Sequence, residues 1–172
     1  MPTTFTQIGT AQIVSTDTTT VEFTNIPATF TDLKVEINAR TDGAGNVEMI
    51  VFTYNNNTSN RSSIAMEGRP ASDSVASFTS SLLFMGNVNA PGQTASSFSN
   101  ASLYIPNYAG SGNKVSISEA SMNGTQNERG GAINYQRWAD STAITSIQFS
   151  LETTARKFVQ YSTFYLYGIK NS

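Results

Sequence analysis

The chain has 172 residues, of which 38% are hydrophobic and only 13% are charged, and it contains neither cysteine nor histidine. The absence of cysteine excludes disulfide bonds and thiolate ligands, and the absence of histidine excludes Ser-His-acid triads and imidazole metal ligands. The net charge is −2, with lysine and arginine scattered, so there is no basic stripe to bind phosphates and no nucleic-acid partner is expected.

Thr, Ser, Asn and Gly are abundant, a composition that favours short strands and polar turns over helices. The length fits a single domain over residues 1–172. No apolar run reaches the length of a membrane span, and Met1 to Thr6 lacks the features of a signal peptide. We therefore expect a folded β domain without a membrane partner.

The first strands are short. Apolar residues between Phe5 and Val14 predict one broken strand or two short ones, so that residues 1–18 form an arm or an edge strand. Thr20–Thr24 is predicted as the next strand, and Pro27 ends it.

Leu33–Arg40 shows the clearest period of two in the chain. Its inward residues are predicted to be Leu33, Val35, Ile37 and Ala39, and its outward residues Lys34, Glu36, Asn38 and Arg40. This pattern is typical of an antiparallel strand with one solvent-exposed face. Val47–Tyr54 follows after a glycine-bearing turn, which predicts a hairpin between the two strands.

Further alternating or apolar segments complete the strand set. They are Ser63–Glu67, Phe78–Met85, Ala101–Ile105, Val115–Ala120, Ile133–Trp138 and Ile144–Leu151, with a loop over Asn87–Ser97. For Phe78–Met85 the alternatives are a buried strand and a short helical turn. Nine or ten strands without a helix of three turns predict an all-β fold. The expected architecture is an antiparallel, jelly-roll-like β-sandwich of two packed sheets.

The closing segment, Ser162–Ile169, has two apolar faces. Phe164 and Leu166 are expected to face the core. Tyr165 and Tyr167 share the other face, which needs a loop, a strand or another chain to cover it. We expect both tyrosines at or near a subunit contact.

No catalytic residues, cofactor site or metal site stand out, and no enzymatic activity is expected. Glu36 and Glu48 would face each other across the predicted hairpin, as a glycosidase pair must. Two solvated charges are the simpler interpretation. The oxygens of Asp42 and Asn46 could contact Ca²⁺, but a turn explains them better.

Trp138 and Tyr135 are the remaining aromatic candidates. They could stack on a sugar or anchor a protein partner, and core packing is the alternative for Trp138. The amides of Asn55–Asn60 could bind sugar, or form a solvated loop. The candidate subunit or partner interface therefore consists of Tyr165, Tyr167, Tyr135 and Trp138.

Four segments in this order resemble small virion structural proteins of tailed bacteriophages, which are capsid decoration or tail-associated components. They are Phe23–Leu33, Leu103–Tyr108, Ala143–Ile147 and Ser162–Ile169, and the resemblance extends from about Val21 to Ile169.

The resemblance implies a jelly-roll-like sandwich that assembles as a homo-oligomer, often a trimer, on a phage particle after synthesis in the host cytoplasm. The leading expectation is a capsid decoration or cement protein, whose partners are its own copies and other virion proteins such as the major capsid protein. A tail-fibre or receptor-binding module for host glycans is the alternative, and a hydrolase of envelope polysaccharide is a distant third.

Overall fold

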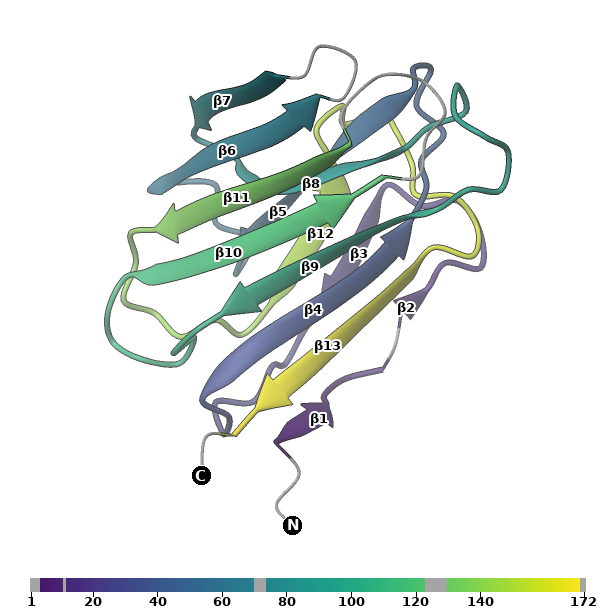
Figure 1. The fold of residues 1–172 in the computed structure, drawn as a ribbon. Coiled ribbons are helices and arrows are strands. Elements are labelled where there is room, and N and C mark those ends of the chain that lie inside the picture. Colours follow the sequence, from purple (N-terminus) through teal and green to yellow (C-terminus); the bar gives the residue numbers. More distant parts are fainter. Residues whose placement is uncertain (1–3, 11, 70–73, 123–129, 171–172) are drawn as a thin grey trace.

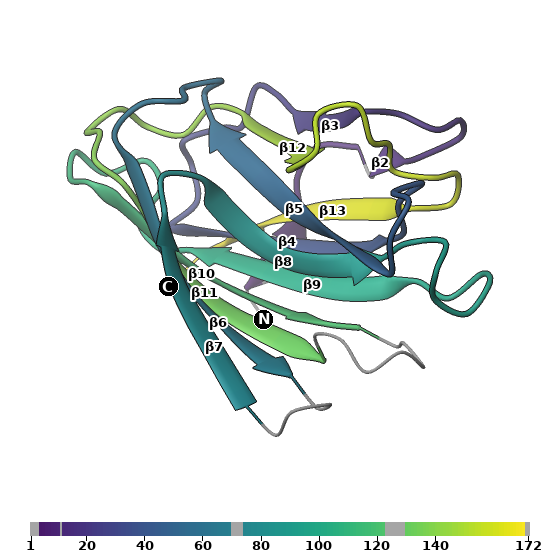
Figure 2. The same ribbon diagram turned by 90° about the horizontal axis from the view of Figure 1, so that it is seen from above.

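Two antiparallel sheets pack face to face in the computed structural model, which describes residues 4–10, 12–69, 74–122 and 130–170. One sheet has nine strands and the other has four. Figure 1 views the larger sheet with the smaller one behind it, and Figure 2 shows the two layers from above. The predicted all-β sandwich is confirmed.

The larger sheet follows the order β1-β13-β4-β9-β10-β11-β6-β7, and β2 pairs with β13 beside β1. Its strands are β1 (Phe5–Gln7), β2 (Gln12–Ile13), β4 (Asp32–Ala39), β6 (Arg61–Arg69), β7 (Ser74–Ser80), β9 (Ser99–Ile105), β10 (Lys114–Ser121), β11 (Gly131–Trp138) and β13 (Thr163–Ile169).

The smaller sheet follows the order β3-β12-β5-β8. Its strands are β3 (Thr20–Phe23), β5 (Val47–Tyr54), β8 (Leu83–Asn89) and β12 (Ile147–Leu151). Among the described residues, no helix is long and apolar enough to cross a membrane.

The core lies between the two sheets, as the alternation of β4 and β13 predicts. The four inward residues of β4 are all buried, as are Phe164 and Leu166 of β13. Phe149 of the smaller sheet joins the layers, because its ring centroid lies 5.7 Å from Phe164 and 6.0 Å from Phe52. These aromatic contacts add to the burial of apolar surface that holds the sandwich together.

The predicted hairpin between Leu33–Arg40 and Val47–Tyr54 is wrong, because β4 and β5 belong to different sheets. β4 has β13 on one side and β9 on the other, so neither edge is free for β5. The connection crosses between the sheets, where the amide of Thr41 donates to Asn89 O and that of Asp42 to Lys157 O.

Arg40 was expected to face solvent, and this is also wrong, since only 9% of the residue is exposed. Its Nη1 donates to the carbonyl oxygens of Thr94, at 2.9 Å, and Ser97, at 2.8 Å. Arg40 directly follows β4 and holds the loop before β9, and carbonyl acceptors make its burial tolerable.

The segment Phe78–Met85 is not one strand. β7 ends at Ser80 in the larger sheet and β8 begins at Leu83 in the smaller one, and the beginning of β7 was not predicted at all. The loop predicted over Asn87–Ser97 starts later, because β8 continues to Asn89. The described strands number thirteen rather than nine or ten.

Candidate functional site

On β10 and β11 the usual orientation of polar and apolar residues is reversed. Ser116, Ser118, Asn134 and Gln136 face the interior and are almost completely buried. The aliphatic and aromatic residues between them face outward and are exposed. An antiparallel sheet in a sandwich normally buries its apolar side, so the reversal needs a physical reason.

The reason is the edge strand of the smaller sheet, β8, which lies against the inner faces of β10 and β11. Gln136 Nε2 donates to Phe84 O at 2.5 Å, and Ser118 Oγ donates to the same oxygen at 3.0 Å. Asn134 Nδ2 donates to Met85 O. Polar side chains of the larger sheet thereby satisfy backbone carbonyls that an unpaired edge would leave open.

The apolar residues of these strands form what we call the outer band, on the face of the larger sheet turned away from the smaller one. Its members are Ile64 and Met66 of β6, Tyr104 of β9, Val115 and Ile117 of β10, and Ile133 and Tyr135 of β11. Each is between 36% and 51% exposed. Exposed apolar residues are ordinary when scattered, whereas a contiguous group on one sheet face is a candidate interaction surface.

The strand register shows that the band is contiguous. Ile117 pairs with Tyr104 on one side and with Tyr135 on the other, and Tyr135 pairs in turn with Ile64. The row continues from Tyr104 through Lys34 of β4 to Tyr167 of β13. Six strands spaced about 4.8 Å apart make this row about 24 Å long.

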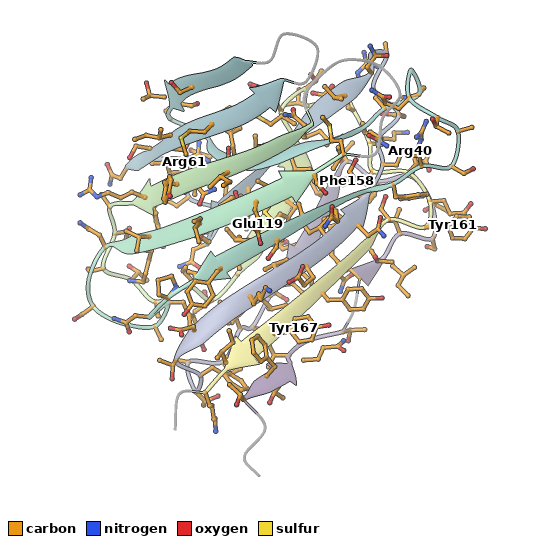
Figure 3. The ribbon with its side chains drawn as sticks, in the orientation of Figure 1. Arg40, Arg61, Glu119, Phe158, Tyr161 and Tyr167 are labelled. Atoms are coloured by element: carbon orange, nitrogen blue, oxygen red, sulfur yellow. The ribbon has the colours of Figure 1, made fainter. Side chains whose placement is uncertain are left out.

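Three of the four predicted interface residues lie on this face. Tyr135 belongs to the outer band, and Tyr165 and Tyr167 are half-buried on β13. Figure 3 labels Tyr167 on β13 and Arg61 on β6, which lie toward opposite edges of the larger sheet. Their role in a subunit contact stays a prediction.

Trp138 belongs to the core instead, with 2% of its surface exposed and its ring centroid 5.7 Å from that of Tyr54. Of the two interpretations of this residue, core packing is the one that fits. Trp138 offers no surface to a partner, so its place in the predicted interface is wrong.

Polar contacts flank the band on β4 and β9. Lys34 Nζ and Glu36 Oε1 form an ion pair at 2.8 Å, and Ser102 Oγ donates to the same carboxylate oxygen at 3.3 Å. Tyr104 Oη donates to Asp32 Oδ2 at 2.7 Å, a hydrogen bond that, together with desolvation and the Asp32 charge, raises the pKa of Tyr104. The bond to Asp32 holds the ring of Tyr104, which the strand register places beside Ile117.

Glu36 and Glu48 do not face each other, because they belong to different sheets. Glu48 Oε1 accepts hydrogen bonds from the amide and hydroxyl of Thr153. Glu36 shares a small polar pocket with Glu119 of β10, which Figure 3 labels. Since Lys34 and Ser102 already engage Glu36, this arrangement has the character of a surface ion pair.

The two oxygen-rich loops are held by internal hydrogen bonds. Asn55 Oδ1 accepts from the amides of Thr145 and Ser146, and its Nδ2 donates to Ala143 O. Asp42 Oδ1 accepts from the amide of Lys157 at 2.7 Å. Across residues 4–10, 12–69, 74–122 and 130–170, no group of three or more acidic residues is placed to hold a metal ion.

A groove of about 820 Å³ opens where β10, β11, β6 and β7 meet. Its apolar lining comes from Ile64, Val115 and Tyr135 of the outer band. Arg61 and Arg137 also line it, as do Thr79 and Ser80 of β7. Arg137 shares the outward face with this apolar surface, whereas Arg61 pairs with the inward-facing Trp138.

Alternation alone did not reveal the outer band. A period of two shows that Val115 and Ile117 share a face, but both faces of such a strand satisfy the same period. The available signal was the alternation of these residues with serine, asparagine and glutamine in two neighbouring strands of the large sheet, β10 and β11. Those amides and hydroxyls can bond a buried backbone without the cost of burying a charge.

No family model and no curated protein matches the chain. Among solved structures, it is similar to galectin LEC-6 from Caenorhabditis elegans, with a TM-score of 0.35 and 10% identity, over 94% of this chain and 96% of the galectin. A likeness at this level assigns neither a family nor a ligand to the chain.

Proposed function

We propose that this chain is a structural protein of a tailed-bacteriophage particle, specifically a capsid decoration protein that attaches and assembles through the outer face of its larger sheet. The observation that carries the assembly part is the outer band: seven large apolar side chains on one contiguous face, behind which the inward residues of β10 and β11 are largely polar. The phage location rests on the four ordered sequence segments that resemble such proteins.

The dimensions of the face support a protein contact. A standard interface covers about 800 Å² on each partner, a patch about 28 Å across. The row from Tyr167 to Ile64 is about 24 Å long and carries three tyrosines. Tyrosine is among the residue types that contribute most of the binding energy at the centre of an interface, and the surrounding apolar contacts exclude water.

In this proposal the mechanism is burial repeated over many copies. Each copy contributes a modest contact to its neighbours and to the shell, and simultaneous engagement multiplies the total affinity. No catalytic step is involved. The proposed partners are other copies of the chain, in a trimer, and virion proteins such as the major capsid protein.

The assembly part is tested by the oligomeric state of the purified protein, measured by sedimentation velocity. We expect the wild type to form an oligomer and Ile117→Lys to dissociate it, because a lysine would place a charge in the middle of the band. Ile13→Lys is the matched control, since Ile13 is exposed on β2, outside the band. A monomeric wild type, or an Ile117→Lys oligomer as stable as the wild type, would contradict the assembly part.

The particle part is tested on phage assembled with and without the protein. Loss of heat resistance in particles lacking it, with antibody label on the head, is the expected result. Unchanged heat resistance would contradict the cementing role, and antibody label on the tail would contradict the head location.

The alternative of a glycan-binding tail module has less support, because Trp138 is buried and the side chain of Asn55 is bonded to Ala143 and Thr145. A glycan array tests it directly, and binding there without label on the head would favour it over decoration.

A further inference from the structure

Two opposite charges flank the centre of the outer band. Glu119 lies two residues beyond Ile117 on β10. Arg137 lies two residues beyond Tyr135 on β11, and Tyr135 is the residue that pairs with Ile117. Both charged side chains are exposed on the face of the band, because strand positions two apart share a face. Since β10 and β11 run antiparallel (Figure 1), the two charges lie on opposite sides of the Ile117–Tyr135 pair.

Neither of these charges is paired within the described part of the chain. The ion pair found there is that of Lys34 and Glu36 on β4. The spacing of strands and residues puts the Cα atoms of Glu119 and Arg137 about 14 Å apart, and the apolar centre of the band lies between them. Each charge is therefore available to a group of opposite sign on another molecule.

A two-fold axis in the plane of the contact exchanges the two charges. Glu119 and Arg137 each lie about 7 Å from the point midway between Ile117 and Tyr135, which we call the axis point. An axis through this point, inclined about 20° from the perpendicular to the strands, brings Glu119 of each copy opposite Arg137 of the other. The strands of the two copies then cross at about 40°, near the angle of about 30° at which aligned sheets pack.

The same axis matches the apolar residues of the band. Ile117 and Tyr135 lie beside it, so each contacts its own counterpart in the second copy. The other members of the band lie within about 10 Å of the axis point, well inside a standard interface of about 800 Å² on each partner. The apolar centre and the flanking charges are thus self-complementary, as an isologous contact requires. This match favours a second copy as the occupant of the face.

We propose that the outer band is the contact between two copies of this chain, packed face to face about a two-fold axis that pairs Glu119 of each copy with Arg137 of the other. The inference rests on the assembly part of the proposed function and gives that contact its symmetry. A trimer is compatible with it, because a two-fold contact between two trimers gives six copies. Tyr167 on β13 lies about 17 Å from the axis point, so this side of the face stays available to other virion proteins.

The experiment is a charge exchange on the full chain, with the dissociation constant of self-association measured by sedimentation equilibrium. Glu119→Arg alone and Arg137→Glu alone each place like charges opposite one another at two points of the contact. Each should weaken self-association about tenfold or more. The double variant exchanges the two signs and should restore the wild-type constant to within about threefold.

Lys170→Glu is the matched control, since Lys170 is an exposed cation just beyond β13 and outside the band. It should leave self-association unchanged. Because Glu119 and Arg137 are exposed, their replacement should leave the circular dichroism and the unfolding midpoint unaltered.

Single-cysteine variants test the symmetry, since the chain contains no cysteine of its own. A short bismaleimide should link Ile117→Cys into dimers, because a two-fold axis beside this residue brings its two copies together. Ile13→Cys should stay unlinked, since Ile13 is exposed on β2, outside the band. The mass of the wild-type assembly should correspond to an even number of copies.

A double variant as weak as the single ones, an assembly of three copies, or Ile117→Cys that stays unlinked would each overturn this inference and leave the proposed function standing. A monomeric wild type would contradict the assembly part of the proposed function as well. Binding of the monomeric wild type to purified capsid shells, abolished by Ile117→Lys, would reassign the face to the shell.

Discussion

Gly86 of β8 packs directly against Ala120 of β10, so that a Cβ at position 86 would overlap the methyl group of Ala120. The backbone of Gly86 also has φ +133°, a conformation that side chains rarely adopt. This contact determines how closely β8 of the smaller sheet can approach β10 of the larger one.

Gly86→Ala should therefore lower the free energy of unfolding by about 2 kcal/mol or more, from overpacking and backbone strain together. The measurement is urea unfolding followed by circular dichroism. Gly112→Ala is the matched control, because nothing lies within 4 Å of a Cβ at that position, and its effect should stay within about 0.5 kcal/mol. Equal effects of the two substitutions would show that the sheets are not in close contact at Gly86.

Gln136→Leu should destabilise the sandwich by about 1–3 kcal/mol, because buried polar groups lose their partners. Gln136 Oε1 accepts from Ser116 Oγ at 2.9 Å, and Nε2 donates to Phe84 O. Hydrogen exchange should accelerate along β8 in this variant. Gln148→Leu, at a half-buried position of β12, serves as the comparison, and a similar loss there would mean that the bonds to β8 contribute little.

Trp138 is the one tryptophan of the chain, so its fluorescence reports its surroundings without interference from a second one. We expect blue-shifted emission that acrylamide quenches poorly, because the side chain is 2% exposed. The emission should be the same in wild type and in Ile117→Lys. Strong quenching in the folded monomer, or a shift on dissociation, would place Trp138 at the subunit contact after all.

Burial of Tyr54 predicts a loss of stability at alkaline pH. Desolvation raises the pKa of its phenol, although the hydrogen bond to Ser116 opposes the shift. In the unfolded chain a tyrosine releases its proton near pH 10, whereas the native state retains it. The stability contributed by this group is therefore fully present below about pH 10 and declines as the pH rises toward the folded pKa.

The comparison of wild type with Tyr54→Phe measures this effect, since the raised pKa values of Tyr104 and Tyr108 are common to both proteins. Below about pH 10 the wild type should be more stable by about 1 kcal/mol, the contribution of the hydrogen bond to Ser116. Above it, the difference should shrink by up to about 1.4 kcal/mol per pH unit. A difference that stays constant from pH 9 to about pH 11 would contradict the burial of Tyr54.

The sequence was most informative where charged and apolar residues alternate. In β4, Lys34 and Glu36 must stay near water, so the buried face follows without ambiguity. In β10 and β11 the alternation is between serine or amide residues and aliphatic residues, and either set can be buried if the first finds hydrogen-bond partners. Those partners, the carbonyls of Phe84 and Met85, come from a strand that no local pattern could place there.

Long-range pairing explains the other differences. A turn with two glycines between two strands predicts a hairpin, but β4 pairs with β9 and β13 instead of β5. The division of Phe78–Met85 between two sheets likewise depends on the strand with which each half pairs. The tyrosines of β13 were identified correctly as residues outside the core, because Phe164 and Leu166 left only one face for them.

Because β4 lies between β9 and β13, both of its edges can be paired only after β13 has been synthesised. One neighbour of β4 lies some 60 residues further along the chain and the other ends at Ile169. A nascent chain must hold β4 with an open edge until almost the whole sequence has emerged, a topology that folds in milliseconds to seconds rather than microseconds. Until then β4 has β9 as its one partner in the larger sheet, and its open edge can pair with strands of other nascent chains.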